Sequence, residues 1–445
     1  MNCILRGIRV LDPLGHLDVD GQDVWICDGR IVAIFKHIGD EMAPVVDLSR
    51  PEGEPSIVIC PGFLDLHAHF REPGAEDAET VITGAMAAAA GGYSHVVTMA
   101  DTTPPVDLPN RVAQSCFRAV ATRVRLLTAA ALTLGREGQQ LVDMKGCVEA
   151  GAVAFSDDEH NRFSGQLLAQ ALETGAALAR TIMVHPEDEE MIRQVNRALE
   201  PSTLLPDRPA AAEVSAIRDS LRALRHARKG RLHFQHVSTA QAVELIDGAK
   251  MEGLPVTAEV SPLHLGMWQP LESPVEPPGL AKLLPPLRSL QDRLALVDGL
   301  RSGAIDAVAS DHSPHGMRDK SGPEDEAAPG AIGLETALST CLTFGGMGGE
   351  WVSTLVERLT QGPFRVLGDA AGVVEPRLRI GEAATCVVFD PAGQAPVRAD
   401  NFHSQSSNTP LRGMQLLGQV LLTIIDGAVV HHDVEGLPFD SRPVE

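Results

Sequence analysis

The chain has 445 residues, 44% of them hydrophobic and 22% charged, which is enough for a large core and exceeds the usual size of one domain. Its 59 acidic residues outnumber 37 basic ones, giving a formal net charge of -22. Such an acidic surface argues against nucleic-acid and anionic-membrane partners. Because no stretch approaches about 18 uninterrupted apolar residues, the sequence also predicts no membrane span.

The cysteines and the N-terminus both predict a cytoplasmic protein. The N-terminal residues MNCILRGIRVLDPLG alternate in polarity like a strand and lack the basic region and long apolar run of a signal peptide. The cysteines are odd in number, widely spaced and without a CxxC pair, which is typical of reduced and mostly buried thiols. They are Cys3, Cys27, Cys60, Cys116, Cys147, Cys341 and Cys386.

Short strand-like runs separated by turn signals fill residues 1–60 and predict an antiparallel β layer. From Pro61, apolar runs alternate with Ala- and Leu-rich helical stretches over about 300 residues, which favours a (β/α)8 barrel. Strand-like runs return after about residue 366. We therefore predict a barrel over 61–365 and a small β-sandwich formed by 1–60 and 366–445.

Two long loops within the barrel region are candidate lids over an active site. Residues 268–287 are rich in proline, and residues 316–330 are polar with glycine and proline. Long polar loops that follow barrel strands often close over a bound substrate.

Five predicted strands end in histidine or aspartate, in PGFLDLHAHF, GAVAFSDD, TIMVHPED, RLHFQHVST and AVASDHSPH. Side chains two residues apart on a strand point the same way, so His67 and His69 would project together at the barrel mouth. Imidazole and carboxylate are ligands that Zn2+ prefers. His233 and His236 face opposite sides of their strand, and His236, nearer the strand end, is the better ligand. A single strand-end histidine is more often structural, but five such ends in order favour a metal site.

Other enzyme classes find little support. The sequence has no Walker A motif, no GxSxG elbow and no GxGxxG following a strand.

The order of these motifs resembles the class I dihydroorotases of the amidohydrolase superfamily. The resemblance rests on HxHxREPG at 67–74, then SDD, HPED, HVST, PPLR and SDHSPH, with GLET at 333–336 and NTPLRG near 408, and it spans essentially the whole chain. It implies one or two Zn2+ ions. The implied ligands are His67, His69, Asp158, His185, His236 and Asp311.

The implied ligand set contains one alternative and lacks a lysine that many relatives have. Asp157 is the alternative to Asp158, since only one of two adjacent strand residues can point inward. Many relatives in the superfamily bridge two metals with a carboxylated lysine, but no lysine lies near the end of GAVAFSDD.

The resemblance also implies a reaction, the reversible hydrolysis of dihydroorotate to N-carbamoyl-L-aspartate in pyrimidine biosynthesis. Asp311 would act as catalytic base and then acid. Arg71 would hold the substrate carboxylate, and His315 would assist it. Pro329 and Gly330 would also contact the substrate, and relatives of this kind are commonly homodimers.

Three residues depart from the dihydroorotase pattern close to the expected substrate. Asp101 stands where the family has an asparagine in M-P-N-T, and would repel a substrate carboxylate unless it is protonated or paired with Arg71. Leu284 replaces an asparagine before PPLR. Leu263 replaces the first histidine of P-H-H-L and leaves only His264.

These departures keep three hypotheses open. The first is an active dihydroorotase. The second is a related enzyme that opens another ring, as hydantoinases, dihydropyrimidinases and allantoinases do. The third is a non-catalytic partner of aspartate carbamoyltransferase, although such proteins typically lose metal-binding histidines and this chain keeps them.

Overall fold

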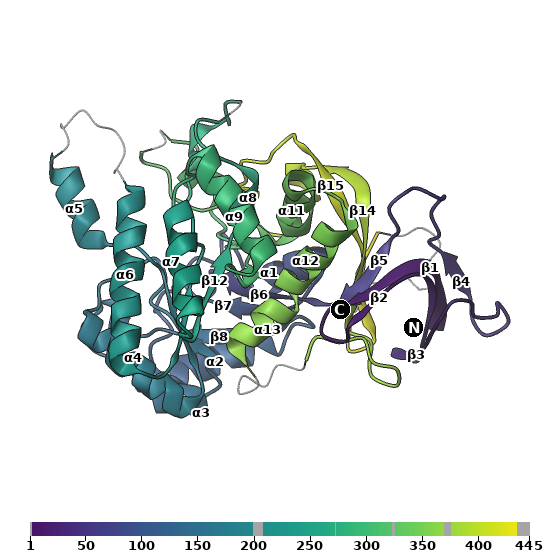
Figure 1. Ribbon diagram of the computed structural model, residues 1–445, viewed down its shortest axis with the longest axis horizontal. Coiled ribbons are helices and arrows are strands. Elements are labelled where there is room, and N and C mark those ends of the chain that lie inside the picture. Colours follow the sequence, from purple (N-terminus) through teal and green to yellow (C-terminus); the bar gives the residue numbers. More distant parts are fainter. Residues whose placement is uncertain (1, 199–207, 272, 323–324, 369–374, 434–445) are drawn as a thin grey trace.

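The computed structural model shows a helix-covered barrel next to a separate β-sheet, on the left and right of Figure 1 respectively. The described residues are 2–198, 208–271, 273–322, 325–368 and 375–433.

The barrel consists of eight parallel strands in chain order from β6 to β13. Most of their residues are buried, as expected for a parallel sheet that is covered on both faces. β6 and β13 form no ladder, but the strands meet just beyond their ends, where the His69 amide donates to the carbonyl of His312 at 2.8 Å. The strands are β6 (Phe63–Ala68), β7 (Tyr93–Thr98), β8 (Arg125–Ala130), β9 (Ala154–Phe155), β10 (Thr181–Val184), β11 (Arg231–Phe234), β12 (Val256–Val260) and β13 (Ala307–Val308).

Helices between and after these strands cover the barrel, and several begin at a side chain that caps free backbone amides. Ser289 caps the helix α9 and forms a capping box with Asp292, and Gly303 ends this helix in a left-handed conformation. The helices are α1 (Val81–Ala90), α2 (Pro109–Ala119), α3 (Met144–Glu149), α4 (Gly165–Leu178), α5 (Glu189–Ala198), α6 (Ala210–Ala227), α7 (Ala240–Met251), α8 (Pro262–Gly266), α9 (Leu290–Ser302), α10 (Met317–Lys320), α11 (Ala337–Gly345), α12 (Gly349–Leu359) and α13 (Gln361–Leu367). Short 3-10 turns lie at η1 (Leu134–Arg136), η2 (Pro278–Ala281), η3 (Leu334–Thr336) and η5 (Ala399–Asn401).

Both ends of the described chain contribute to the second sheet, which is one continuous mixed sheet. Its order is β16-β15-β14-β5-β1-β2-β3, and β4 also pairs with β1. β5 joins the two chain ends, because it runs parallel to β1 and antiparallel to β14. The strands are β1 (Asn2–Asp12), β2 (Leu17–Cys27), β3 (Arg30–Phe35), β4 (Val45–Asp47), β5 (Val58–Pro61), β14 (Cys386–Pro396), β15 (Gln415–Ile425) and β16 (Ala428–His432).

The barrel interior is closed at one end by apolar side chains. Leu64, Leu66, Val97 and Met183 from the strands form a buried cluster with Phe364 of α13. Thr181, at the start of β10, donates to the carbonyl of Val366 in α13 at 2.6 Å. Since α13 covers the amino-terminal ends of the strands, the opposite, carboxyl-terminal end is left for a polar site.

The predicted (β/α)8 barrel with a small β domain drawn from both chain ends is confirmed, and the β domain predicted as a sandwich is one continuous mixed sheet. The predicted domain boundaries fall within β5 and α13, and they remain predictions. All seven cysteines are free thiols, five of them buried. Among the described residues, no helix combines the length and apolar character that crossing a membrane requires.

Candidate metal centre and active site

The six side chains predicted as metal ligands meet at the carboxyl-terminal ends of the barrel strands. Each lies within the last residues of a strand or in the first three after it, and five are fully buried, while the Asp311 side chain is 18% exposed. They are His67 (in β6), His69 (after β6), Asp158 (after β9), His185 (after β10), His236 (after β11) and Asp311 (after β13).

Asp158 lies at the centre of this group, and each of its oxygens faces a different pair of histidines. Asp158 Oδ2 is 3.1 Å from His67 Nε2 and 3.4 Å from His69 Nε2. Asp158 Oδ1 is 3.8 Å from His185 Nδ1 and 3.7 Å from His236 Nε2. One carboxylate therefore joins two triads of potential metal ligands.

Asp311 lies beside the first triad as a fourth potential ligand. Its Oδ1 lies 3.8 Å from His67 Nε2 and 3.7 Å from His69 Nε2. Both Asp311 and His236 have left-handed backbones, with φ of 50° and 29°. Non-glycine residues adopt a positive φ uncommonly, although aspartate and histidine do so more readily than most.

The donors fit a cation. Burial alone would raise the pKa of Asp158, but the neighbouring histidines, His67 foremost, hold it well below its usual range. Asp158 Oδ1 is buried without a hydrogen-bond partner among the described residues, although buried carboxylate oxygens are normally paired. The nitrogens of His185 and His236 approach to 2.9 Å. A buried anion with an unpartnered oxygen, surrounded by imidazoles, is chemistry that a metal ion satisfies.

The two adjacent aspartates have different surroundings. Asp157 Oδ1 accepts from the amides of Leu132 at 2.8 Å and Thr133 at 2.9 Å, and its Oδ2 accepts from the Thr133 hydroxyl. Asp157 therefore braces the loop after β8, whereas Asp158 faces the histidines.

A buried carboxylate in β12 orients His67. Glu259 Oε1 lies 2.8 Å from His67 Nδ1, and Glu259 Oε2 lies 3.0 Å from His233 Nε2. Burial would raise the pKa of Glu259, but hydrogen bonds from His233 and His67 lower it to about 2. The carboxylate thus accepts from Nδ1 and leaves Nε2 of His67 free for the cluster, as outer partners of metal-binding histidines do.

The sequence reasoning did not identify Glu259. The sequence did contain an indication of Glu259. It is the one charged residue of the strand VTAEV, and a charged side chain is rarely buried in a strand without a partner. Nor did it identify Glu187, whose Oε2 lies 3.3 Å from His185 Nε2 and also pairs with Arg208.

Arg71 and Asp101, both predicted to contact the substrate, form an ion pair. Arg71 Nη1 donates to Asp101 Oδ2 at 2.5 Å, and the same oxygen lies 2.9 Å from His69 Nδ1. Arg71 also donates to Ser313 Oγ at 2.7 Å and to the Pro314 carbonyl at 3.1 Å. Burial would raise the pKa of Asp101, but His69 and Arg71 lower it overall, so Asp101 is an anion.

Comparison with known proteins places the chain in a family. Residues 56–198 match a family described as Dihydro-orotase-like. The chain is 34% identical over 437 residues to the dihydroorotase of Aquifex aeolicus, covering 97% of this chain and 100% of that protein. It is 38% identical over 443 residues to the dihydroorotase of Anaeromyxobacter sp. (strain K), covering 96% and 98% of the two chains. The chain belongs to the dihydroorotase family.

Solved structures agree on the fold. L-hydantoinase (dihydropyrimidinase) from Arthrobacter aurescens superposes with a TM-score of 0.82 at 24% identity, covering 98% of this chain and 97% of that one. Dihydropyrimidinase from Brevibacillus agri NCHU1002 gives 0.81 at 22% identity, covering 97% and 95%. At these identities the likeness concerns the fold alone.

Two departures from the dihydroorotase pattern, Leu263 and Leu284, replace polar residues by apolar ones. Leu263 packs in an apolar cluster with Leu283, Leu287 and neighbouring residues, and Leu284 is half-buried. His264 is buried and fully engaged, since its Nε2 is 3.0 Å from the Pro285 carbonyl and its Nδ1 is 2.8 Å from Ser261 Oγ.

The remaining predicted substrate residues form a hydrogen-bonded group. His315 Nε2 lies 2.9 Å from the carbonyl of Pro329, which can only accept, so Nε2 carries the proton. Burial and the charges of Arg71 and Lys320 lower the pKa of His315 to about 3, which leaves it neutral. Asn408 donates to the carbonyls of Ser313 and Gly330 at 3.0 and 3.2 Å.

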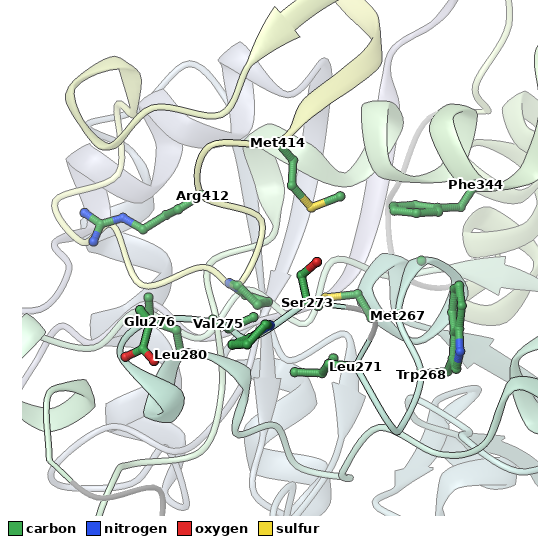
Figure 2. A pocket seen from close by; sticks show the side chains of 13 residues that line it. Met267, Trp268, Leu271, Ser273, Val275, Glu276, Leu280, Phe344, Arg412 and Met414 are labelled. Atoms are coloured by element: carbon green, nitrogen blue, oxygen red, sulfur yellow. The ribbon is translucent and has the colours of Figure 1, made fainter.

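A cavity of about 240 Å3 lies beside these predicted substrate residues and is lined by Arg71, Asp101 and His315, among others. A larger cavity, of about 300 Å3, lies elsewhere, and no predicted site residue lines it. Its walls are mainly apolar, with Met414 and Phe344 on one side and Leu271 on the other (Figure 2). The smaller cavity is the better candidate for substrate binding, because Arg71, Asp101 and His315 line it and Asp101 contacts His69 of the cluster.

Proposed function

We propose that this protein is an active dihydroorotase that hydrolyses dihydroorotate to N-carbamoyl-L-aspartate, and catalyses the reverse cyclisation, in pyrimidine biosynthesis. The main support is the buried cluster around Asp158, in which all six predicted ligands converge, within a chain similar over its full length to dihydroorotases. The complete cluster also argues against a non-catalytic partner of aspartate carbamoyltransferase.

The residues suit two Zn2+ ions that share Asp158. His67, His69, Asp158 and Asp311 would hold one ion, and Asp158, His185 and His236 would hold the other. When bound, zinc lowers the pKa of a coordinated water from 15.7 to about 7 and polarises a carbonyl.

Asp311 is suited to move the proton. Burial would raise the pKa of its carboxyl, but the contact with His69 and the charges of His67 and His236 lower it overall. The carboxylate is therefore ionised at neutral pH and can accept a proton on Oδ1, the oxygen that faces the cluster. It would take this proton from water as the water oxygen bonds to the ring carbonyl carbon, and would donate it to the ring nitrogen as the amide carbon–nitrogen bond breaks.

Arg71, His315 and the peptide of Pro329 and Gly330 would hold the substrate. Arg71 can offer only part of its guanidinium, because Asp101, Ser313 and Pro314 already accept from it. We propose that it contacts the substrate carboxylate through a remaining N–H group, and not through a free bidentate fork. The positive charge of Arg71 and the metal would offset the acidic surface of the chain.

The Arg71–Asp101 pair favours a second candidate function, hydrolysis of an uncharged ring. Among the described residues, Arg71 is the one arginine that lines the 240 Å3 cavity, and a carboxylate that neutralises it weakens the preference of the cavity for an anionic substrate. A hydantoin or a dihydropyrimidine would suit such a site.

One experiment separates these functions. The zinc-loaded protein is assayed against dihydroorotate, hydantoin, dihydrouracil and allantoin at equal concentrations. We expect the highest kcat/KM for dihydroorotate, together with cyclisation of N-carbamoyl-L-aspartate. Turnover of an uncharged ring without turnover of dihydroorotate would replace the first function by the second. We further expect a homodimer, which sedimentation would test.

A further inference from the structure

Lys320, at the end of α10, is a fully buried lysine whose ammonium group donates only to backbone carbonyls. Lys320 Nζ lies 2.6 Å from the carbonyl oxygen of Ala328, 2.8 Å from that of Gly330 and 3.3 Å from that of Lys282. An ammonium group has three N–H donors, so these carbonyls use all of them.

The three carbonyls belong to the two loops that the sequence suggested as lids. Ala328 and Gly330 end the 316–330 loop, and Lys282 lies in the 268–287 loop. Further bonds join the same loops, from the Gly330 amide to the Lys282 carbonyl at 2.9 Å and from Lys282 Nζ to the Asp325 carbonyl at 2.8 Å. Lys320 thus links two parts of the 316–330 loop to each other and links this loop to the 268–287 loop.

The segment that Lys320 holds, Pro329–Gly330, is the one predicted to contact the substrate. His315 donates to the Pro329 carbonyl, and Asn408 donates to the Gly330 carbonyl, which also accepts from Lys320. Gly330 has a φ of 113°, and a Cβ there would collide with Ser313 Oγ. The backbone at 329–330 is therefore held in one specific conformation beside Arg71 and His315.

We propose that Lys320 is a positioning residue for the substrate: its ammonium group holds the two loops together and so sets the places of His315, Pro329 and Gly330. The proposal rests on the proposed function for the identity of the substrate. An isolated buried charge is expensive, and an apolar side chain would stabilise the fold more simply. Three charge-assisted hydrogen bonds offset part of this penalty and fix the loop geometry.

The charged and titratable groups that face Lys320 are Lys282 from the neighbouring loop and His315. Burial and the charge of Lys282 lower the pKa of Lys320 to about 8. Above this pH, Lys320 loses a proton and can donate to only two carbonyls. KM should therefore rise on the alkaline side.

Deprotonation of Lys320 weakens substrate binding in this account, but it does not weaken the stability of the fold. Between about pH 8 and the ordinary pKa of lysine, the unfolded chain binds more protons than the folded protein. Lys320 therefore makes the free energy of unfolding increase with pH over this range, so a rise in KM there cannot be attributed to unfolding caused by Lys320.

The test compares Lys320→Met with Lys250→Met in the zinc-loaded enzyme. Lys250 is a matched control, because it donates to the Gly303 carbonyl at 2.9 Å and to Asp306 at 2.6 Å, at the opposite end of the barrel. We expect Lys320→Met to raise KM for dihydroorotate about tenfold, with kcat changed less than about threefold, as for a displaced binding group. Lys250→Met should lower Tm and leave KM unchanged.

One further measurement keeps the proposal testable if Lys320→Met does not fold, and a second examines the loops directly in the folded variant. In the wild type, KM should rise above about pH 8, and in Lys320→Arg, which stays charged, this rise should disappear. Amide hydrogen exchange of Ala328 and Gly330 should accelerate in Lys320→Met, with or without substrate. A wild-type KM and wild-type exchange in Lys320→Met would overturn the proposal. Faster exchange in a protein that does not hydrolyse dihydroorotate would instead refute only the proposed function.

Discussion

The metal cluster and the substrate shell lie beside each other at one end of the barrel, but they are built differently. The cluster is carried by strand ends, and its histidines are oriented by buried carboxylates such as Glu259 and Asp101. The substrate shell is carried by loops, and main-chain carbonyls such as those of Pro314 and Pro329 hold Arg71 and His315. The barrel itself therefore fixes where a metal can bind, whereas loop contacts decide which ring can bind beside it.

The largest effect is expected from Asp158→Asn, which changes the residue at the centre of the metal cluster. The amide keeps the shape but removes the charge shared by both triads. We expect bound zinc to fall from two ions to at most one, and kcat/KM to fall by more than about 10^3-fold. Metal analysis after dialysis and steady-state kinetics measure both changes.

Asp157→Asn is the matched control for this change. It weakens hydrogen bonds to Leu132 and Thr133, so the free energy of unfolding should fall by about 1–3 kcal/mol while bound zinc stays constant. If Asp157→Asn lost the metal and Asp158→Asn kept it, the assignment of the two aspartates would be reversed.

A smaller effect is expected from Glu259→Gln, which tests whether buried partners hold the cluster. The neutral amide polarises His67 less and can accept from only one of the two histidines. Zinc affinity should fall by about 10- to 100-fold, measured by competition with a chelator. Thr257→Val, which removes the 2.8 Å contact to His233 Nδ1 and leaves His67 untouched, should change affinity much less. Equal losses in the two variants would mean that Glu259 acts only through packing.

The smallest effect is expected from Asp101→Asn, which tests the substrate shell alone. An asparagine oxygen can still accept from His69, but Arg71 is no longer neutralised. KM for dihydroorotate should fall about tenfold with little change in kcat, because a like charge no longer faces the substrate carboxylate. KM for uncharged dihydrouracil should not change. A similar shift for both rings would show that the charge of Asp101 does not select the substrate.

The residues at strand ends and the residues in loops also differ in how far they could be predicted from the sequence. His67, His69, His185, His236 and Asp311 could be identified because strand geometry and the barrel rule place such residues together. The choice of Asp158 over Asp157 came from the resemblance, and the contacts of Asp157 to the loop after β8 support it.

The loop-borne contacts could not be derived in this way. Lys320 meets the Lys282 carbonyl because two irregular loops fold over one another, and no periodicity encodes that contact. The sequence offered two outcomes for Asp101, protonation or pairing with Arg71, and the structure shows the pairing. The contact of Asp101 with His69 was not expected, since a turn separates Asp101 from β7.

Titration of the metal-free protein with zinc, with dihydroorotate hydrolysis measured at each step, tests the central proposal most directly. If Asp158 joins two metal sites in a dihydroorotase, activity should rise with added zinc and level off at two ions per chain. Turnover that does not depend on metal, or the absence of dihydroorotate hydrolysis at every zinc level, would contradict the proposal.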